Sequence, residues 1–177
     1  PGINLLVVTG GPGVVNMAMH SGKRVIGAGP GNPPAVVDET ADIEKAGRDL
    51  VAGAGLDNNL PCIAEKTIVV VDQVADRLMA AMERNGARRL KPDEADAVTR
   101  LVVKRQEGKD PLACADRHEV LSQCAIDKNY VGVNAERILK DAGVPVSGDP
   151  RIAFMEVGRE HPLVWLEQLL PVIPVVR

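Results

Sequence analysis

The chain has 177 residues, a formal net charge of −3, and one residue each of Trp, Tyr and Phe. A chain of this length can bury roughly 70% of its unfolded surface, which allows a stable core without staples. The scarce aromatic side chains and the absence of a basic stripe argue against a nucleic-acid-binding domain. No apolar run is long enough to cross a bilayer, and the three widely spaced cysteines indicate a reducing, cytoplasmic location.

The first elements indicate a strand–helix–strand unit. Residues 3–8 form a continuous apolar run, which is typical of a strand buried on both faces of a parallel sheet. A glycine turn at residues 10–13 precedes a short helical pattern at residues 14–19, and a second strand is expected at residues 24–26.

Strands and helices alternate through the rest of the chain, which predicts an α/β fold with a mostly parallel sheet flanked by helices. Asp38 or Thr40 is expected to cap the first of these helices, and Asp72 the second. Further strands are expected at residues 35–37, 67–71, 151–155 and 172–176. Helices are expected at residues 41–52, 74–83, 92–105 and 134–142, with a helical turn in 161–170. Loops are expected at residues 85–92 and 106–116.

Residues 57–66 place one cysteine in a polar, turn-forming segment between a helix and a strand. Structural cysteines are usually buried, whereas this composition brings Cys62 to the edge of the fold. Cys62 is therefore a candidate nucleophile, and Lys66 is a candidate cation to favour its thiolate. The alternative interpretation is a cysteine that merely lies near a turn. Asn58 and Asn59 are either oxyanion donors or turn residues, and the turn role is favoured for Asn58.

Two glycine-rich turns carry weaker signals. Residues 10–13 lie between a strand and a helix, where helix N–H groups can bind a phosphate. They lack the glycine spacing of the dinucleotide-binding fingerprint. Residues 27–31 are interpreted as a turn in which backbone approaches backbone closely.

The remaining cysteines and histidines do not form a recognisable site. Cys114, His118 and Cys124 match no common zinc spacing and lack a fourth ligand, so no metal site is predicted. His20 and His161 stand alone in the sequence and are expected to be surface or capping residues.

Four motifs occur in one order along the chain, and together they resemble aldehyde dehydrogenases. More narrowly, they resemble the CoA-acylating aldehyde dehydrogenases of bacterial microcompartments, which oxidise propionaldehyde or acetaldehyde. The likeness covers essentially the whole chain and is most specific between residues 5 and 66. The motifs are Thr9-Gly10-Gly11, the glycine- and proline-rich residues 27–34, the segment 57–62 that ends in Cys62, and residues 167–171.

The resemblance implies an aldehyde dehydrogenase-like catalytic domain with Cys62 as nucleophile. The Cys62 thiolate would attack the aldehyde to give a thiohemiacetal, hydride would pass to NAD, and CoA would take the acyl group from the resulting thioester. The backbone N–H of Cys62 would supply half of an oxyanion hole. Thr9, Gly10 and Gly11 match the turn beside the cofactor, and Glu167 matches the residue that binds the nicotinamide ribose.

One glycine distinguishes two branches of the family. Enzymes of the hydrolytic branch resemble this sequence around residues 24–34 but place a glutamate where Gly27 stands. That glutamate activates water to hydrolyse the thioester. Without such a general base, hydrolysis of the thioester is expected to be slow, so a thiol such as CoA can take the acyl group before water does.

The resemblance also implies an organisation and a set of partners. Residues 1–22 match the end of a cofactor-binding domain and residues 23–177 the catalytic domain of a longer protein. That parent is expected to be a homo-oligomer in the cytoplasm or inside a bacterial microcompartment, with the shell as a partner and with no nucleic acid or membrane bound. The isolated chain is expected to be inactive or nearly so.

Two alternatives remain open at this point. One is an NADPH-dependent acyl-phosphate reductase of the same superfamily, which Gly27 does not exclude and which would require phosphate in place of CoA. The other is a non-catalytic interaction domain in which Cys62 is structural and unreactive.

Overall fold

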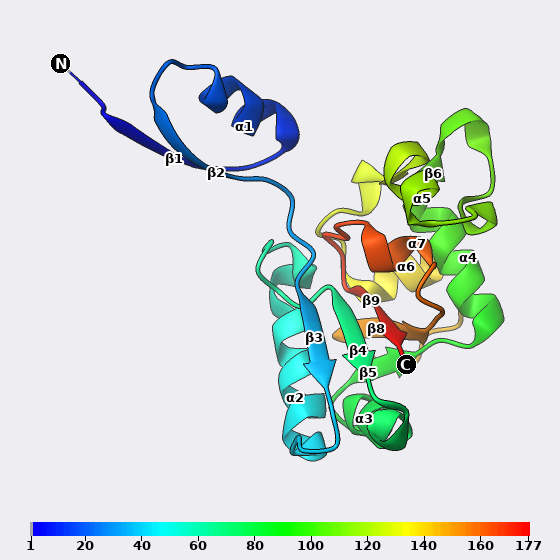
Figure 1. The fold of residues 1–177 in the computed structure, drawn as a ribbon. Coiled ribbons are helices and arrows are strands. Elements are labelled where there is room, and N and C mark those ends of the chain that lie inside the picture. The colour runs from blue at the N-terminus through cyan, green and yellow to red at the C-terminus, as the bar shows by residue number, and fades with distance from the viewer. Residues whose placement is uncertain (1) are drawn as a thin grey trace. The chain divides into compact units, whose positions relative to one another are not determined.

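The computed structural model describes residues 2–177 and separates into two compact units, one ending at Gly31 and one running from Asn32 to Arg177. The first unit contains β1 (Leu5–Thr9), α1 (Pro12–Met19) and β2 (Arg24–Ala28). The two strands are parallel, with Leu5 paired to Arg24 and Thr9 to Ala28. The predicted strand–helix–strand unit is therefore confirmed (Figure 1).

The prediction that the first strand is buried on both faces is wrong for this unit. Residues of β1 alternate between exposed and half-buried, and Val7 remains 70% exposed. The reason is that β1 has β2 as its strand neighbour and α1 as its covering helix. The apolar composition of residues 3–8 correctly predicted a strand of a parallel sheet. It did not indicate how many layers cover that strand within this unit.

The division between the units falls later than the predicted boundary after residue 22. β2 is hydrogen-bonded to β1 along its whole length, so it belongs to the first compact unit. Gly27, in β2, consequently belongs to the first compact unit, although the sequence placed it in the second predicted domain, residues 23–177. The assignment of the units to a cofactor-binding and a catalytic domain stays a prediction.

The second unit is built on a five-stranded, wholly parallel sheet in the order β3-β4-β9-β8-β5. This confirms the predicted α/β fold with a mostly parallel sheet. The strands are β3 (Pro34–Val37), β4 (Thr67–Val70), β5 (Ala87–Arg89), β8 (Ile152–Glu156) and β9 (Val172–Val176). The edge strand β5 lies where a loop was expected, because the sequence Ala-Arg-Arg carries no apolar alternation.

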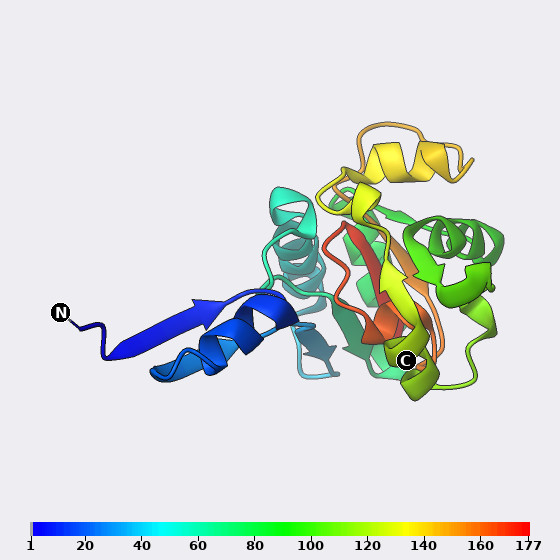
Figure 2. The ribbon, with the colours of Figure 1, turned by 90° about the horizontal axis from the view of Figure 1, so that it is seen from above.

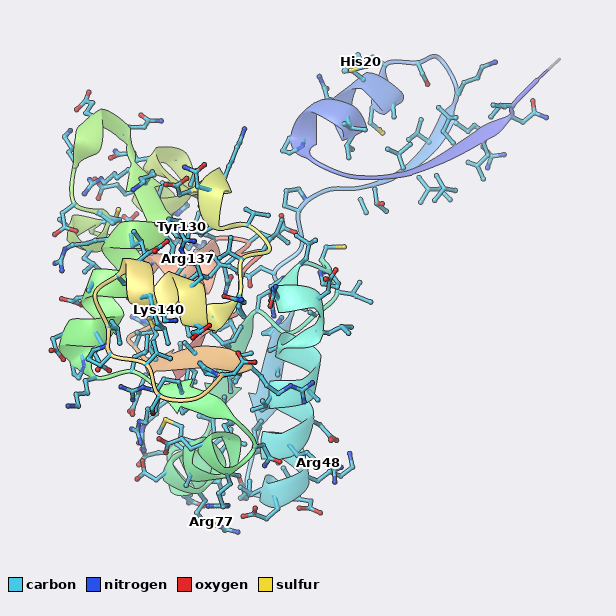
Figure 3. All side chains as sticks on the ribbon, turned by 180° about the vertical axis from the view of Figure 1, so that it is seen from behind. His20, Arg48, Arg77, Tyr130, Arg137 and Lys140 are labelled. Carbon is cyan, nitrogen blue, oxygen red and sulfur yellow. The ribbon has the colours of Figure 1, made fainter. Side chains whose placement is uncertain are left out.

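Helices cover both faces of this sheet (Figures 1 and 2). On one face α2 (Ile43–Ala54) and α3 (Asp72–Arg84) pack against a core of buried aliphatic residues. The opposite face is covered by a second core. Its helices are α4 (Pro92–Val102), α5 (Arg117–Gln123), α6 (Ala135–Asp141) and α7 (Pro162–Trp165). Charged side chains such as Arg48 on α2 and Arg77 on α3 lie on the outer surface (Figure 3).

A small antiparallel pair, β6 (Val103–Arg105) and β7 (Cys124–Ile126), stands apart from the main sheet. It flanks α5 and includes the last residues of the helix expected over 92–105, which ends at Val102 instead. Short 3₁₀ turns η2 (Gln106–Gly108), η3 (Pro111–Ala113) and η4 (Lys128–Tyr130) connect these elements. No helix in residues 2–177 combines the length and the apolar character that a membrane span requires.

Neither of the two expected helix caps is formed. Asp42 caps α2 by accepting a hydrogen bond from the backbone N–H of Lys45, whereas Asp38 instead accepts from Thr40 in the preceding turn. Asp72 is the first residue of α3 and makes an ion pair with Arg177 rather than a cap. Several acids and hydroxyls near a helix start can each accept from its free N–H groups, so the sequence did not identify which residue caps α2.

Candidate active site

The candidate nucleophile lies in a loop with an unusual backbone. α2 leads into the turn η1 (Leu56–Asn59), in which Asp57, Asn58 and Asn59 have φ values of 47°, 53° and 61°. These left-handed conformations cost roughly 1–2 kcal/mol for each residue that is not glycine, and Asn and Asp tolerate them best. Such a backbone persists only where surrounding contacts fix it.

A buried pair of residues fixes this loop. Asn59 donates from Nδ2 to the carbonyl oxygens of Ala54 at 2.8 Å and Glu65 at 2.9 Å. Lys66 donates from Nζ to both the backbone oxygen and Oδ1 of Asn59, each at 2.5 Å. Both residues are fully buried. Asn59 is therefore a structural residue with its amide fully engaged, and its interpretation as an oxyanion donor is wrong.

Asn58 anchors the same loop from its other side. Its Nδ2 donates to the carbonyl oxygen of Gly132 at 2.9 Å, and the N–H of Gly132 donates to Leu169 at 2.8 Å. Gly132 has a φ of +71°, which suits glycine. The turn role expected for Asn58 holds, and the structure adds Gly132, which sequence reasoning missed.

Cys62 lies between the two clamped ends of this loop. The N–H of Ala64 donates to the Pro61 oxygen at 3.1 Å, so Cys62 and Ile63 form the exposed tip of a tight turn. Within residues 2–177 nothing accepts a hydrogen bond from the backbone N–H of Cys62. The prediction that Cys62 lies at the edge of the fold is confirmed, because the residue is exposed.

Lys66 and Glu167 share the electrostatic environment of this loop. Burial lowers the pKa of Lys66, and the negative charges of Glu167, Cys62 and Glu65 oppose that shift. The structure thus brings Cys62, Lys66 and Glu167 together across more than 100 residues of sequence. The Lys66 ammonium group therefore interacts electrostatically with Cys62, whereas its hydrogen bonds go to Asn59.

The segment that follows α7 is held against the base of this loop by a residue that the sequence did not single out. The side chain of Gln168 is fully buried and donates from Nε2 to the backbone oxygen of Lys66. This contact places the half-buried Glu167 next to the loop. A second such residue is Asn32, which donates to the Val164 oxygen at 2.8 Å. A polar residue within an apolar run, such as Gln168 between Leu166 and Leu170, was the available signal.

The turn Thr9-Gly10-Gly11 lies in the first compact unit. Thr9 ends β1, and the N–H of Gly10 donates to the Ala28 oxygen at 3.2 Å. Gly11 is the N-cap of α1, and a Cβ added there would meet no atom within 4 Å. The beginning of α1 is therefore open, as a phosphate-binding helix N-terminus must be.

Gly27 pairs with Val8 beneath α1. A Cβ added at Gly27 would lie 3.0 Å from Cγ1 of Val15, which is tighter than ordinary van der Waals contact. The expectation of a turn in which backbone approaches backbone is therefore wrong here, because Gly27 lies in β2, its close neighbour is a side chain of α1, and a Cβ at Gly29 would meet no atom within 4 Å.

The two isolated histidines have the roles that were expected. His20 is exposed at the end of α1 with Nδ1 2.8 Å from the Asn16 oxygen (Figure 3). His161 caps α7 by accepting at Nδ1 from the N–H of Leu163 at 3.3 Å. Burial lowers the pKa of His161 to about 4, against the opposing charge of Asp96.

The residues weighed as metal ligands are only partly assembled. The sulfur atoms of Cys114 and Cys124 lie 3.5 Å apart, whereas His118 is exposed on α5. Among residues 2–177 there is no group of three or more His, Cys, Asp or Glu side chains that could hold a metal ion.

The sequence model of the aldehyde dehydrogenase family matches residues 1–107, and the chain belongs to that family. It is 44% identical over 177 residues to a propanal dehydrogenase (CoA-propanoylating) of Citrobacter freundii, covering 99% of this chain and 34% of the relative. It is 42% identical to the acetylating acetaldehyde dehydrogenase EutE of Escherichia coli K12, covering 100% of this chain and 36% of EutE. The resemblance inferred from the motifs is thereby confirmed.

Solved structures support the same fold. A propionaldehyde dehydrogenase from a fucose-utilisation microcompartment of Clostridium phytofermentans superposes with a TM-score of 0.83 at 40% identity, covering 99% of this chain and 36% of that one. A Rhodopseudomonas palustris propionaldehyde dehydrogenase with bound CoA and an acylated cysteine gives a TM-score of 0.81 at 40% identity, covering 100% of this chain and 37% of that one. An engineered glycolyl-CoA reductase with bound NADP⁺ gives a TM-score of 0.81 at 40% identity, covering 100% of this chain and 36% of that one. The chain thus spans about a third of the length of these relatives.

Proposed function

We propose that this chain is the catalytic part of an oxidoreductase that converts a short-chain aldehyde to acyl-CoA with NAD. The observation that carries the proposal is the exposed Cys62, held on a clamped turn within the electrostatic reach of Lys66. The acylated cysteine in the similar R. palustris propionaldehyde dehydrogenase supports the same role for Cys62. The CoA-propanoylating and acetylating names of the relatives support the choice of substrates.

The proposed chemistry begins with attack by the Cys62 thiolate on the aldehyde carbonyl, which gives a thiohemiacetal on the sulfur atom. The backbone N–H of Cys62, which has no acceptor within residues 2–177, would donate to the developing oxyanion. Loss of hydride leaves an acyl thioester on Cys62. Attack by the CoA thiol then releases acyl-CoA and restores the Cys62 thiolate.

NAD would supply the hydride acceptor when it is bound. The open N-terminus of α1 at Gly11 fits a phosphate group, which supports a cofactor role for Thr9, Gly10 and Gly11. Glu167 would bind the nicotinamide ribose, and its position beside the Cys62 loop supports that role. NAD is proposed here although one similar structure holds NADP⁺.

Gly27 supports acyl transfer to CoA over hydrolysis. The hydrolytic branch of the family uses a glutamate at the matching position to activate water. Gly27 offers no general base, and the contact with Val15 leaves little room for a larger side chain. We therefore expect the thioester on Cys62 to survive until a thiol attacks it.

We propose that the chain works within a longer, homo-oligomeric protein in the cytoplasm or inside a bacterial microcompartment. The length of the relatives and the microcompartment origin of one similar structure support this setting, with the shell as a partner. In isolation the chain is expected to lack NAD-dependent aldehyde oxidation. Detectable oxidation by the isolated chain would contradict this part of the proposal.

Acyl exchange tests the proposal without requiring the complete protein. Propionyl-CoA should transfer its propionyl group to Cys62, detected as acylation of the tryptic peptide 49–66, while peptides 110–117 and 118–128 stay unmodified. The Cys62→Ser variant is the control and should not be acylated at this peptide. Acylation by propionyl phosphate but not by propionyl-CoA would favour the acyl-phosphate reductase. A Cys62 that stays inert both in the isolated chain and in the full-length protein would favour a structural cysteine.

A further inference from the structure

Cys114 and Cys124 form a thiol pair outside the proposed active site. Cys114 follows the turn η3, Cys124 begins β7, and their sulfur atoms lie 3.5 Å apart. A disulfide requires a separation of about 2.05 Å between the sulfur atoms. The remaining distance is small enough for side-chain rotation, because Cys114 lies in an irregular segment whose neighbours can adjust.

The two thiols differ in accessibility. Cys114 is half-buried and lines a cavity of about 410 Å³ together with residues 158–162, which connect β8 to α7. Cys124 is buried, at 8% exposure, and packs in the second hydrophobic core. A small oxidant can therefore reach Cys114 through the cavity more readily than it can reach the buried Cys124.

The surroundings of Cys124 also favour reaction at Cys114 first and at Cys124 second. Burial, together with the hydrogen bond and charge of Cys114, raises the pKa of the Cys124 thiol to about 12. Two of these causes depend on Cys114 as a free thiol and disappear once its sulfur atom is bonded to another sulfur. Arg105, paired with Cys124 across the two strands, remains beside it and favours its thiolate.

We propose that Cys114 and Cys124 are a redox modification site that closes to an intramolecular disulfide with a small disulfide such as oxidised glutathione. The Cys114 thiolate attacks one sulfur atom of the oxidant, forming a mixed disulfide and releasing one glutathione thiolate. The Cys124 thiolate then attacks the Cys114 sulfur atom and releases the second glutathione. The oxidant takes up two electrons, and the two protons of the cysteine thiols end on the two glutathione molecules.

The disulfide would close a covalent ring that contains the whole of α5. That helix is otherwise held by the ion pair between Glu119 and Arg105 and by its packing on α7. Oxidation would therefore fix the segment between η3 and β7, and Cys62, in a separate loop, would take no part in this disulfide.

Peptide mapping of the oxidised chain tests the proposal. Trypsin cleaves after Lys109, Arg117 and Lys128, so the two cysteines fall on different peptides, 110–117 and 118–128. After incubation with oxidised glutathione and blocking of free thiols, these peptides should appear joined without reduction. Two of the three thiols of the reduced chain should be consumed in this joined product, and peptide 49–66 with Cys62 should be absent from it.

Three variants separate this site from the proposed nucleophile. Cys62→Ser should form the same joined peptides, which shows that the closure needs no help from Cys62. Cys124→Ser should stop at the mixed disulfide and retain glutathione on Cys114. Cys114→Ser should leave Cys124 unmodified.

Other results would overturn the proposal. In one, Cys114 of the wild-type chain stays glutathionylated without joining Cys124. In another, Cys62 supplies the second sulfur atom of the disulfide. In a third, Cys124 of the Cys114→Ser variant reacts as fast as Cys114 does in the wild-type chain. Each would show that the 3.5 Å pair does not function as a dithiol.

Discussion

Lys66 donates hydrogen bonds to both the backbone and the side-chain oxygen of Asn59, and so joins the two ends of the loop that carries Cys62. Because Asn59 is left-handed, this contact holds a backbone conformation that the free chain would rarely adopt. The same ammonium group interacts electrostatically with Cys62 and Glu167. One buried lysine thus fixes the loop by hydrogen bonds and places a cation near Cys62 and Glu167.

Replacing Lys66 with methionine should destabilise the chain by about 1–3 kcal/mol, because two buried oxygen atoms of Asn59 lose their donor. Urea unfolding measures this loss. Lys45→Met is the matched control, since Lys45 makes only an exposed, solvent-screened ion pair with Asp49. Equal stability losses in the two variants would contradict the structural role of Lys66.

Alkylation by iodoacetamide at neutral pH should modify Cys62 far faster than Cys124. Cys62 is exposed, whereas Cys124 is buried and has a pKa of about 12, which leaves roughly a thousandfold less thiolate than an ordinary thiol has. Peptide mass spectrometry after timed quenching gives the two rates. In urea the rates should converge. If they already agree in the folded chain, the described environments of these thiols are wrong.

The same assay in Lys66→Met tests electrostatic activation of the thiol. Removing the buried cation should slow alkylation of Cys62 near neutral pH while leaving the rate at Cys114 unchanged. Far-ultraviolet circular dichroism establishes that the variant is folded under the conditions used. An unchanged Cys62 rate in a folded variant would show that Lys66 acts only on loop structure.

His161 should make the chain less stable in acid. Its pKa is about 4 when folded and about 6.5 when unfolded, so the unfolded chain binds more protons between these values. Stability from this group is present above pH 6.5 and is lost as the pH falls towards 4, by about 3 kcal/mol in total. Unfolding free energies at a series of pH values measure the loss.

His161→Asn is the control for this pH dependence, because Asn can still cap α7 but does not titrate. Between pH 4 and 6.5 the unfolding free energy of the variant should fall by about 3 kcal/mol less than that of the original chain. Parallel profiles for the variant and the original chain would mean that His161 is readily protonated in the folded state.

Gly27→Glu should test the choice between acyl transfer and hydrolysis in the longer protein that we propose contains this chain. The added carboxylate should raise the ratio of free acid to acyl-CoA. It should also strain the contact with Val15 at a cost of about 1–3 kcal/mol. Gly27→Ala separates the effects, because it introduces the Cβ without a base. A product ratio that is the same in both variants would show that position 27 does not set the reaction outcome.

The sequence by itself determined the alternation of strands and helices, since apolar periodicity records which side of each element is buried. It also placed Cys62 at an exposed turn and indicated the family through ordered motifs. It missed β5, whose residues Ala87–Arg89 show no period and form a strand only because β8 offers free backbone groups beside them. It also overestimated the burial of β1, because composition does not record how many layers surround a strand.

Only the tertiary structure decided which residues hold the candidate site. Gln168 and Lys66 are 102 positions apart, and their contact exists because β9 and β4 are neighbours in the sheet. The pairing of Asn59 with Lys66 needed a left-handed backbone that no local propensity favours across successive residues. Local sequence determines what each segment can form. Which polar groups must satisfy one another is decided when segments distant in sequence are buried together.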